Sequence, residues 1–245
     1  MTQDSKTQDQ RLSAATPLSF DAQAIPIHEV CHDQAKVAQH ILDPLALRSR
    51  FQSPPIWQPE ITDENRQVIA ADIIAKRQAA GKITRAAVLI PLLLKSEGLS
   101  VLLTQRTDHL HDHAGQISFP GGRMDPDDAS PHDTALRESE EEIGLDRAAV
   151  EIIGHLPQYL TVSGYSVTPV VGFVKPQAEY VLDTFEVADV FEVPLHFLMD
   201  PANHQVRVWE SDQGSRRFYS MPYENRFIWG ATAGMLRNLY HLLKV

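Results

Sequence analysis

Cysteine is almost absent from this chain, which has only Cys31 among its 245 residues. No intrachain disulfide can form, and a reducing compartment is the natural expectation. Long apolar runs are missing as well: the longest, Ala86 to Leu94, is too short to span a bilayer, and the opening MTQDSKTQDQ has no signal-peptide core. We therefore expect a soluble, cytoplasmic protein with no membrane partner.

Basic residues are also in short supply. Lys and Arg number 22 against 32 Asp and Glu, so the net charge is -10 and the pI is near 5.5. Nucleic-acid and membrane-surface binding both need clustered positive charge, so the balance argues against either partner. An anionic substrate would have to be received by metal ions and a few placed arginines.

Acidic side chains gather on one expected helix, near residues 137 to 142. Glu138, Glu141 and Glu142 fall within about a third of the helix circumference, whereas Leu136 and Ile143 point the opposite way. Like charges at this spacing repel one another, and a hard divalent cation such as Mg²⁺ would offset the repulsion. The alternative, for an isolated string of this kind, is a solvated acidic face.

The surrounding spacing favours a metal site. Gly121 and Gly122 predict a turn, and the chain then reads R-E-S-E-E-E-I-G-L from Arg137. This pattern resembles the second half of the Nudix box, G-x5-E-x7-R-E-U-x-E-E-x-G-U, where U is a bulky apolar residue. The sequence departs from the box in three ways: Ser139 replaces an apolar residue, Asp128 replaces the first glutamate, and the loop is one residue longer.

A second stretch, just upstream, strengthens the resemblance. Leu102 to Gly122 reads LLTQRTDHLHDHAGQISFPGG, which is similar to the signature of the coenzyme A pyrophosphatase subfamily of Nudix hydrolases. The same subfamily resembles this chain in its longer loop and its aspartate at position 128. Thr107 and His111 depart from the signature, which has a small Ser or Ala and an arginine there. Together the two stretches cover about 44 contiguous residues.

The resemblance implies metal-dependent hydrolysis of a pyrophosphate bond. Mg²⁺ or Mn²⁺ would be held by the Gly122 carbonyl together with the carboxylates of Glu138, Glu141 and Glu142. Glu138 is also a candidate general base, and Arg137 would orient a neighbouring carboxylate. Many Nudix enzymes use a further acid from a later loop, for which Glu186 is the first candidate and Asp183 and Asp189 are the alternatives.

The substrate is expected to be a small nucleotide derivative. By the subfamily resemblance and their expected place in the cleft, its contacts would be Arg106, His111, Gly115, Gln116, Ser163 and Tyr165. We expect coenzyme A or an acyl derivative, cut to 3′,5′-ADP and 4′-phosphopantetheine. Two alternatives stay open: a Nudix hydrolase for ADP-ribose or another nucleoside diphosphate derivative, and a catalytically dead ligand sensor.

The order of expected elements predicts an α/β fold. Apolar runs at 85–94, 101–106, 150–156, 167–174 and 187–193 indicate strands, with a hairpin at 206–221 and a closing helix at 228–243. We predict a weakly ordered tail over 1–20, a helical N-terminal appendage over 21–82 and a Nudix-type α/β/α sandwich with a mixed sheet over 83–245. The appendage would include helices at 34–42, after Asp43 and at 63–80. It would pack on the domain, cover the cleft or form a homodimer interface.

Overall fold

The structure is a computed structural model, which describes residues 21–59, 79–81, 83–110, 114–161, 163–211 and 214–245. Two predicted features, the tail over 1–20 and most of the helix over 63–80, lie outside these ranges. No helix among the described residues is long and apolar enough to cross a membrane.

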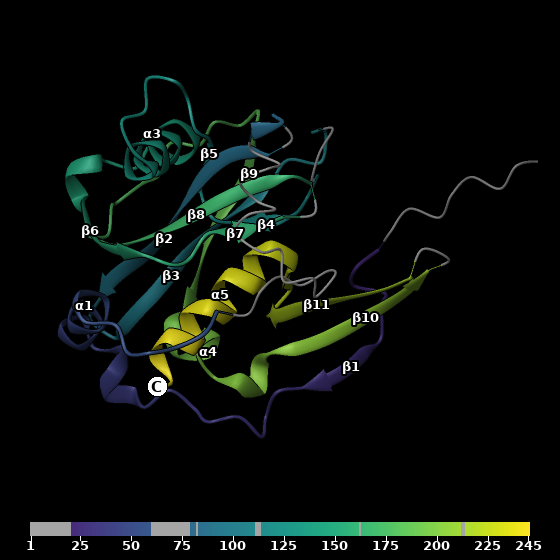
Figure 1. Cartoon of the computed structure of the whole chain (residues 1–245). Coiled ribbons are helices and arrows are strands. Elements are labelled where there is room, and N and C mark those ends of the chain that lie inside the picture. Colours follow the sequence, from purple (N-terminus) through teal and green to yellow (C-terminus); the bar gives the residue numbers. More distant parts are fainter. Residues whose placement is uncertain (1–20, 60–78, 82, 111–113, 162, 212–213) are drawn as a thin grey trace, which may run out of the picture.

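A mixed eight-stranded sheet forms the centre of the molecule (Figure 1). Its principal strand order is β4-β3-β2-β8-β6, β2 and β8 run parallel, and the other pairs are antiparallel. The strands are β2 (Thr84–Lys95), β3 (Gly98–Arg106), β4 (Ile117–Ser118), β5 (Gly121–Arg123), β6 (Val150–His155), β7 (Tyr159–Leu160), β8 (Tyr165–Val174) and β9 (Val187–Pro194). The strands predicted from the apolar runs are confirmed.

The sheet opens at one end of β2 and β3. These strands pair with each other only next to their hairpin turn, and farther along β4 pairs with β3 while β5 pairs with β2. The predicted turn at Gly121–Gly122 is therefore wrong, because both residues belong to β5. A Cβ atom on Gly121, whose φ is 151°, would lie 2.4 Å from the Ala87 carbonyl oxygen, so this approach requires glycine.

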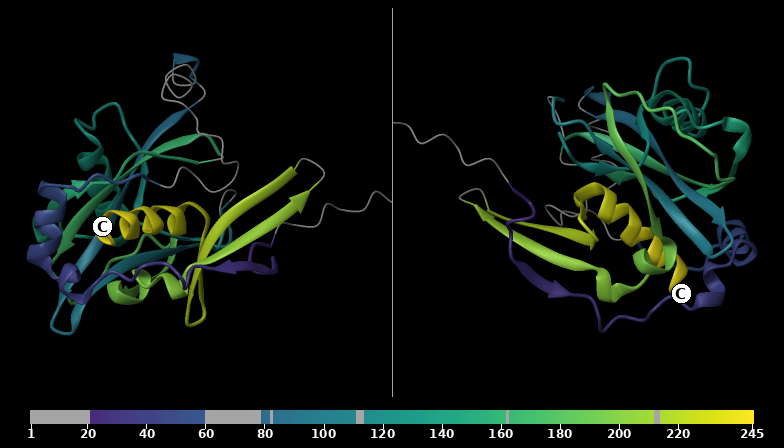
Figure 2. Two further views of the ribbon diagram at one scale, coloured as in Figure 1. Left: turned by 60° about the horizontal axis from the view of Figure 1, so that its bottom comes forward. Right: turned by 180° about the vertical axis from the view of Figure 1, so that it is seen from behind.

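Helices cover both faces of this sheet (Figure 2). On one face, α3 (Pro131–Ile143) buries Ala135 and Ile143 in a cluster that includes Leu89 and Val170 of the sheet. On the other, α5 (Gly230–Leu243) and α4 (Leu195–Leu198) join the larger apolar cluster. The predicted α/β/α arrangement is confirmed, and each helix is held by an apolar stripe that faces the sheet.

A second, four-stranded sheet has the order β1-β10-β11-β12. Its hairpin of β10 (Gln205–Ser211) and β11 (Gly214–Tyr223) was predicted, but β1 (Ile27–Val30) and β12 (Arg226–Trp229) were not. The closing helix consequently begins at Gly230 rather than at residue 228. Both missed strands have four residues each, too few for alternation to identify them.

The described part of the N-terminal segment packs closely on the rest. The predicted helix at 34–42 is wrong, since only a 3₁₀ turn, Gln39–Leu42, forms there. The helix after Asp43 is confirmed as α1 (Pro44–Gln52), and the Asp43 side chain accepts from the Leu45 N–H. The Tyr240 hydroxyl of α5 donates to the Ala35 carbonyl at 2.6 Å. Further 3₁₀ turns span Arg147–Ala149 and Pro201–Asn203.

Candidate active site

Helix α3 carries the acidic face, and its sequence specifies both ends. Ser130 caps the first turn by accepting from the Asp133 N–H, Pro131 occupies the first helical position, and Gly144 ends the helix in the left-handed region. Ser139, the residue that departs from the box, is fully buried, and its hydroxyl donates to the Ala135 carbonyl at 2.6 Å. The hydroxyl is thus satisfied within the helix, which makes a polar residue tolerable there.

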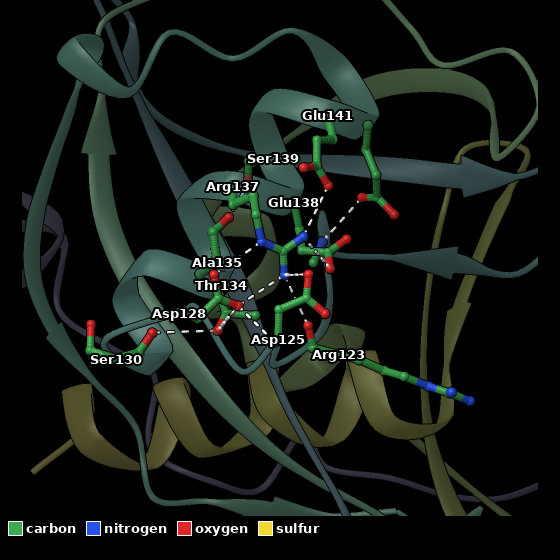
Figure 3. A network of polar contacts seen from close by, with 12 residues as sticks. Arg123, Asp125, Asp128, Ser130, Thr134, Ala135, Arg137, Glu138, Ser139 and Glu141 are labelled. Carbon is green, nitrogen blue, oxygen red and sulfur yellow. Dashed lines mark hydrogen bonds and ion pairs between the residues drawn. The ribbon is translucent and has the colours of Figure 1, made fainter.

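Arg137 is the centre of a polar network (Figure 3). Its Nε and Nη2 atoms donate to Asp128 at 3.0 and 2.9 Å, and its Nη1 atom lies 3.0 Å from both Glu138 and Glu141. Nη2 also donates to the Arg123 carbonyl at 3.0 Å. Arg137 therefore ties the acidic helix to the loop before it and to β5.

Asp128 is the partner that anchors this network. Its side chain is only 6% exposed and also accepts from the Thr134 hydroxyl and the Asp125 N–H, each at 2.9 Å. Hydrogen bonds from Arg137 hold the pKa of Asp128 well below its usual range and raise the pKa of Arg137. An aspartate, shorter than the glutamate of the box, thus secures a loop that is one residue longer.

Glu142 is the most buried carboxylate of the acidic face. Its side chain is 8% exposed, one oxygen accepts from the Gly121 N–H at 3.1 Å, and the other lies 3.9 Å from Arg106. Burial raises the pKa of Glu142 to about 8, and the charges of Glu138 and Glu186 raise it further, against the opposing effect of Gly121 and Arg106. Burial also raises the pKa of Glu138. A strongly perturbed carboxyl such as that of Glu142 is typical of functional sites.

Glu186 lies beside this pair, although it is distant in sequence. Its carboxylate is 3.8 Å from Arg106, the same guanidinium that approaches Glu142. Hydrogen bonds tie its loop to α3 and to the end of β3. The Asp183 N–H donates to the Glu142 carbonyl at 2.9 Å, and Thr107 donates from its N–H to the Glu186 carbonyl and from its hydroxyl to that of Phe185.

The two alternative loop acids have other partners. Asp183 accepts from the Phe185 N–H at 2.9 Å within its own loop, whereas Asp189 is paired with Arg226. Among Asp183, Glu186 and Asp189, Glu186 is therefore the one placed against the acidic face.

The donor chemistry suits a hard divalent cation, because Glu138, Glu142 and Glu186 offer carboxylate oxygens, and the charge of Glu186 raises the pKa of both Glu138 and Glu142. A Cβ on Gly122 would lie 2.5 Å from the Glu138 carboxyl, so glycine brings backbone and carboxylate together here. Within the described ranges no three Asp, Glu, His or Cys side chains converge on one point, since Glu138 and Glu141 face Arg137.

The predicted substrate residues fall into separate places. Arg106 is beside the carboxylates, whereas Gly115 and Gln116 line a cavity of about 370 Å³ on the other side of β3. Tyr165 accepts a hydrogen bond from Arg123 at 2.7 Å, and Ser163 is bonded to Thr161 at 2.9 Å. His111 lies outside the described residues.

Two residues were not singled out for the roles the structure gives them. Arg123 contacts both the Arg137 network and Tyr165, and Thr107 holds the Glu186 loop. In the sequence, Thr107 stood out only as a departure from the subfamily signature, and no signal pointed to Arg123.

Helix α3 carries partly buried carboxylates that are bonded to Arg137, and it lies beside β5, the glycine-containing strand of the mixed sheet. This arrangement is that of a Nudix hydrolase, and comparison with known proteins agrees. The NUDIX domain family matches residues 83–213, just over half of the chain, and the chain belongs to that family. A relative named "Uncharacterized Nudix hydrolase NudL", from Yersinia pestis (strain Pestoides F), is 44% identical over 155 residues, covering 63% of this chain and 77% of that protein. The same protein name and values recur in Yersinia pseudotuberculosis serotype O:1b (strain IP 31758).

Solved structures give weaker likenesses. A Nudix hydrolase from M. smegmatis, RenU, is 22% identical with a TM-score of 0.40, over 46% of this chain and 71% of that one. A C. elegans Ap4A hydrolase is 20% identical with a TM-score of 0.41, over 49% of this chain and 86% of that one. These likenesses are too weak to bear on the substrate. The family membership makes this protein an enzyme of pyrophosphate hydrolysis on small nucleotide derivatives, a class that generally uses divalent metal ions.

Proposed function

We propose that this protein hydrolyses the pyrophosphate bond of coenzyme A or an acyl derivative, producing 3′,5′-ADP and 4′-phosphopantetheine or its acyl form. One observation carries the proposal: Arg106, within the stretch that resembles the coenzyme A subfamily signature, lies within 3.9 Å of Glu142 and 3.8 Å of Glu186. The signature and the Nudix carboxylates thus meet in one site.

Glu138, Glu141, Glu142 and the Gly122 carbonyl would hold Mg²⁺ or Mn²⁺. When bound, such an ion neutralises phosphate oxygens and makes water a better nucleophile. Arg137 keeps Glu138 and Glu141 in place from the side of the loop. Glu138 or Glu186 would accept the proton of the attacking water, because both flank the buried Glu142.

Arg106 has a second role in this proposal. It is the cation that faces Glu142 and Glu186, and its side chain is 25% exposed, so it can also meet a phosphate of the substrate. A site that binds the 3′-phosphate should prefer coenzyme A over dephospho-coenzyme A. A charge-assisted contact is worth roughly 1.5–3 kcal/mol, or about one to two decades in kcat/KM.

The test is kcat/KM for coenzyme A, dephospho-coenzyme A, ADP-ribose and NADH with Mg²⁺ or Mn²⁺, from about pH 6 to 9. We expect coenzyme A to lead. If His111 rather than an arginine binds the 3′-phosphate, the preference over dephospho-coenzyme A should fade as pH rises through the imidazole titration. ADP-ribose or NADH leading at every pH would overturn the assignment.

The second candidate, a Nudix hydrolase for ADP-ribose or another nucleoside diphosphate derivative, is favoured if the departures at Thr107 and His111 change what the site binds. The same panel separates it from the first. A dead ligand sensor is disfavoured because Arg137 and all three helix glutamates are retained.

A further inference from the structure

A cavity of about 370 Å³ lies on the face of β3 opposite the acidic helix. Its walls come from four parts of the chain that are distant in sequence: residues 21–23, Gln105 of β3, residues 114–117 before and within β4, and residues 225–227 and 229 at β12. Because it joins the N-terminal segment, the central sheet and the second sheet, this cavity is a product of the tertiary fold and could not be predicted from any one motif.

The cavity is adjacent to the active site through β3. Gln105 and Arg106 are consecutive, at a register shift in the pairing of β3 with β9, and their side chains contact different parts of the chain. Gln105 lines the cavity and accepts from Arg226, whereas Arg106 faces Glu142 and Glu186. The Arg106 N–H also donates to the Gln116 carbonyl at 2.9 Å, and Gln116 is a cavity residue. The two sites therefore lie at the same strand end.

Among the described residues, the charges of the cavity wall do not suit a phosphate. Arg226 is the cation of the wall, and its guanidinium is bonded to Asp189 and Gln105 and lies 4.5 Å from the centre of the Phe191 ring. Asp21 adds a negative charge to the same wall. An anion placed there would meet a cation already neutralised by a carboxylate.

The remaining wall chemistry suits an uncharged, planar group that forms hydrogen bonds. Four lining residues, Gln23, Gln105, Gln116 and Asn225, carry side-chain amides, which both donate and accept; the Gln105 oxygen already accepts from Arg226. Phe227 and Trp229 are the aromatic residues of the wall, where the Arg207 guanidinium lies 4.9 Å from the centre of the Phe227 ring and the Phe218 ring lies 5.5 Å from that of Trp229. Aromatic rings pack well on flat groups. Nucleobases and amide-bearing chains share this chemistry, and coenzyme A contains both.

We propose that this cavity is the subsite for the uncharged, hydrogen-bonding moiety of a nucleoside diphosphate derivative whose diphosphate is held at the acidic helix. The assignment rests on the proposed function, which supplies the diphosphate end. Asn225 and Gln116 are then specificity residues, because they meet a part of the substrate that does not react. Loss of such a contact raises KM and leaves kcat unchanged.

The test compares Asn225→Ala and Gln116→Ala with Glu224→Gln, a control on the same turn as Asn225 but outside the cavity wall. KM and kcat are measured for coenzyme A and ADP-ribose. We expect a roughly five- to tenfold rise in KM for the two cavity variants, with kcat unchanged and the control like wild type. A rise with coenzyme A alone assigns the cavity to the amide chain, and a rise with both substrates assigns it to the shared adenine.

A binding experiment separates this inference from the substrate proposal. Pantetheine and adenosine are titrated into the wild-type protein and Asn225→Ala in chelator, and backbone amide shifts are followed by NMR. We expect one probe to shift residues 114–117 and 225–229 of the wild type and to bind the variant more weakly. That result would support the cavity as a binding site for the uncharged moiety even if no substrate of the panel were hydrolysed. Unchanged KM values, or no probe that shifts these residues, would overturn the inference.

Discussion

Glu142 shows how a single buried carboxyl links charge, stability and catalysis. Its pKa of about 8 exceeds its ordinary value of 4.5, so the folded chain without metal binds this proton more tightly than the unfolded chain does. The free energy of unfolding should therefore fall as pH rises from about 4.5 to about 8. Glu142→Gln keeps a neutral group there and should weaken this decline. Denaturant titrations of the wild type and Glu142→Gln in chelator, repeated across this pH range, measure the free energy of unfolding. An identical pH dependence of that free energy in the two proteins would contradict the account.

The pKa of Asp128 is shifted in the opposite direction from that of Glu142, and Asp128 should therefore stabilise the fold at neutral pH. Its pKa is lowered by Arg137, so the stability it contributes is present above the ordinary value of 3.8 and is lost as pH falls further. Asp128→Asn leaves Arg137, whose side chain is 18% exposed, with weaker partners, and we expect a loss of about 2–3 kcal/mol. Asp127→Asn, at the exposed neighbouring position, is the control and should change stability by less than about 0.5 kcal/mol.

At the scale of elements, the Glu186 loop depends on the end of β3. The Thr107 hydroxyl donates to the Phe185 carbonyl at 2.8 Å, its N–H donates to the Glu186 carbonyl, and the His109 and Phe185 rings are 4.9 Å apart. Thr107→Val keeps the shape but removes the hydroxyl. We expect kcat to fall roughly 3–10-fold, with faster amide exchange over residues 183–187.

Thr107→Ser is the matched control, because it restores the hydroxyl and should recover most of the rate. If Thr107→Val slowed catalysis while exchange in the loop stayed as in the wild type, positioning of Glu186 would not explain the effect. A direct role of Glu186 is tested separately by Glu186→Gln.

The elements that sequence predicted and those that it missed differ in length and in partners. Strands β2, β3 and β8 and helix α3 carry long apolar patterns and capping residues, so local sequence specified them. Strands β1 and β12 are short, and their conformation is set by pairing with β10 and β11. Likewise, motif spacing predicted Glu138, Glu142 and Arg137 as site residues, whereas the position of Thr107 against the Glu186 loop exists only in the folded chain.

At the scale of the whole molecule, the N-terminal segment is tied to the rest through both sheets. Strand β1 pairs with β10, Arg48 of α1 bonds to Glu151 of β6 at 2.7 Å, and Gln34 accepts a hydrogen bond from the buried Arg237. Removing residues 1–82 should therefore expose the apolar face beneath α1 and give insoluble or unfolded protein. Removing residues 1–20 should leave catalysis unchanged, because their composition cannot support a core.

Solubility, thermal unfolding and kcat/KM of the two truncations check this expectation. A well-folded, fully active 83–245 chain would contradict the role given to the N-terminal segment. A large loss of activity on removing residues 1–20 would contradict the expectation that these residues are dispensable for catalysis.

The most direct test of the central claim is identification of the products formed from coenzyme A. Wild type with Mg²⁺ or Mn²⁺ should produce equal amounts of 3′,5′-ADP and 4′-phosphopantetheine, as separated by chromatography and identified by mass. Glu142→Gln should form both at least about 100-fold more slowly while it remains folded, because it loses a carboxylate of the acidic face. Full activity in excess chelator, near wild-type turnover by Glu142→Gln, or no cleavage of coenzyme A by the wild type would contradict the account.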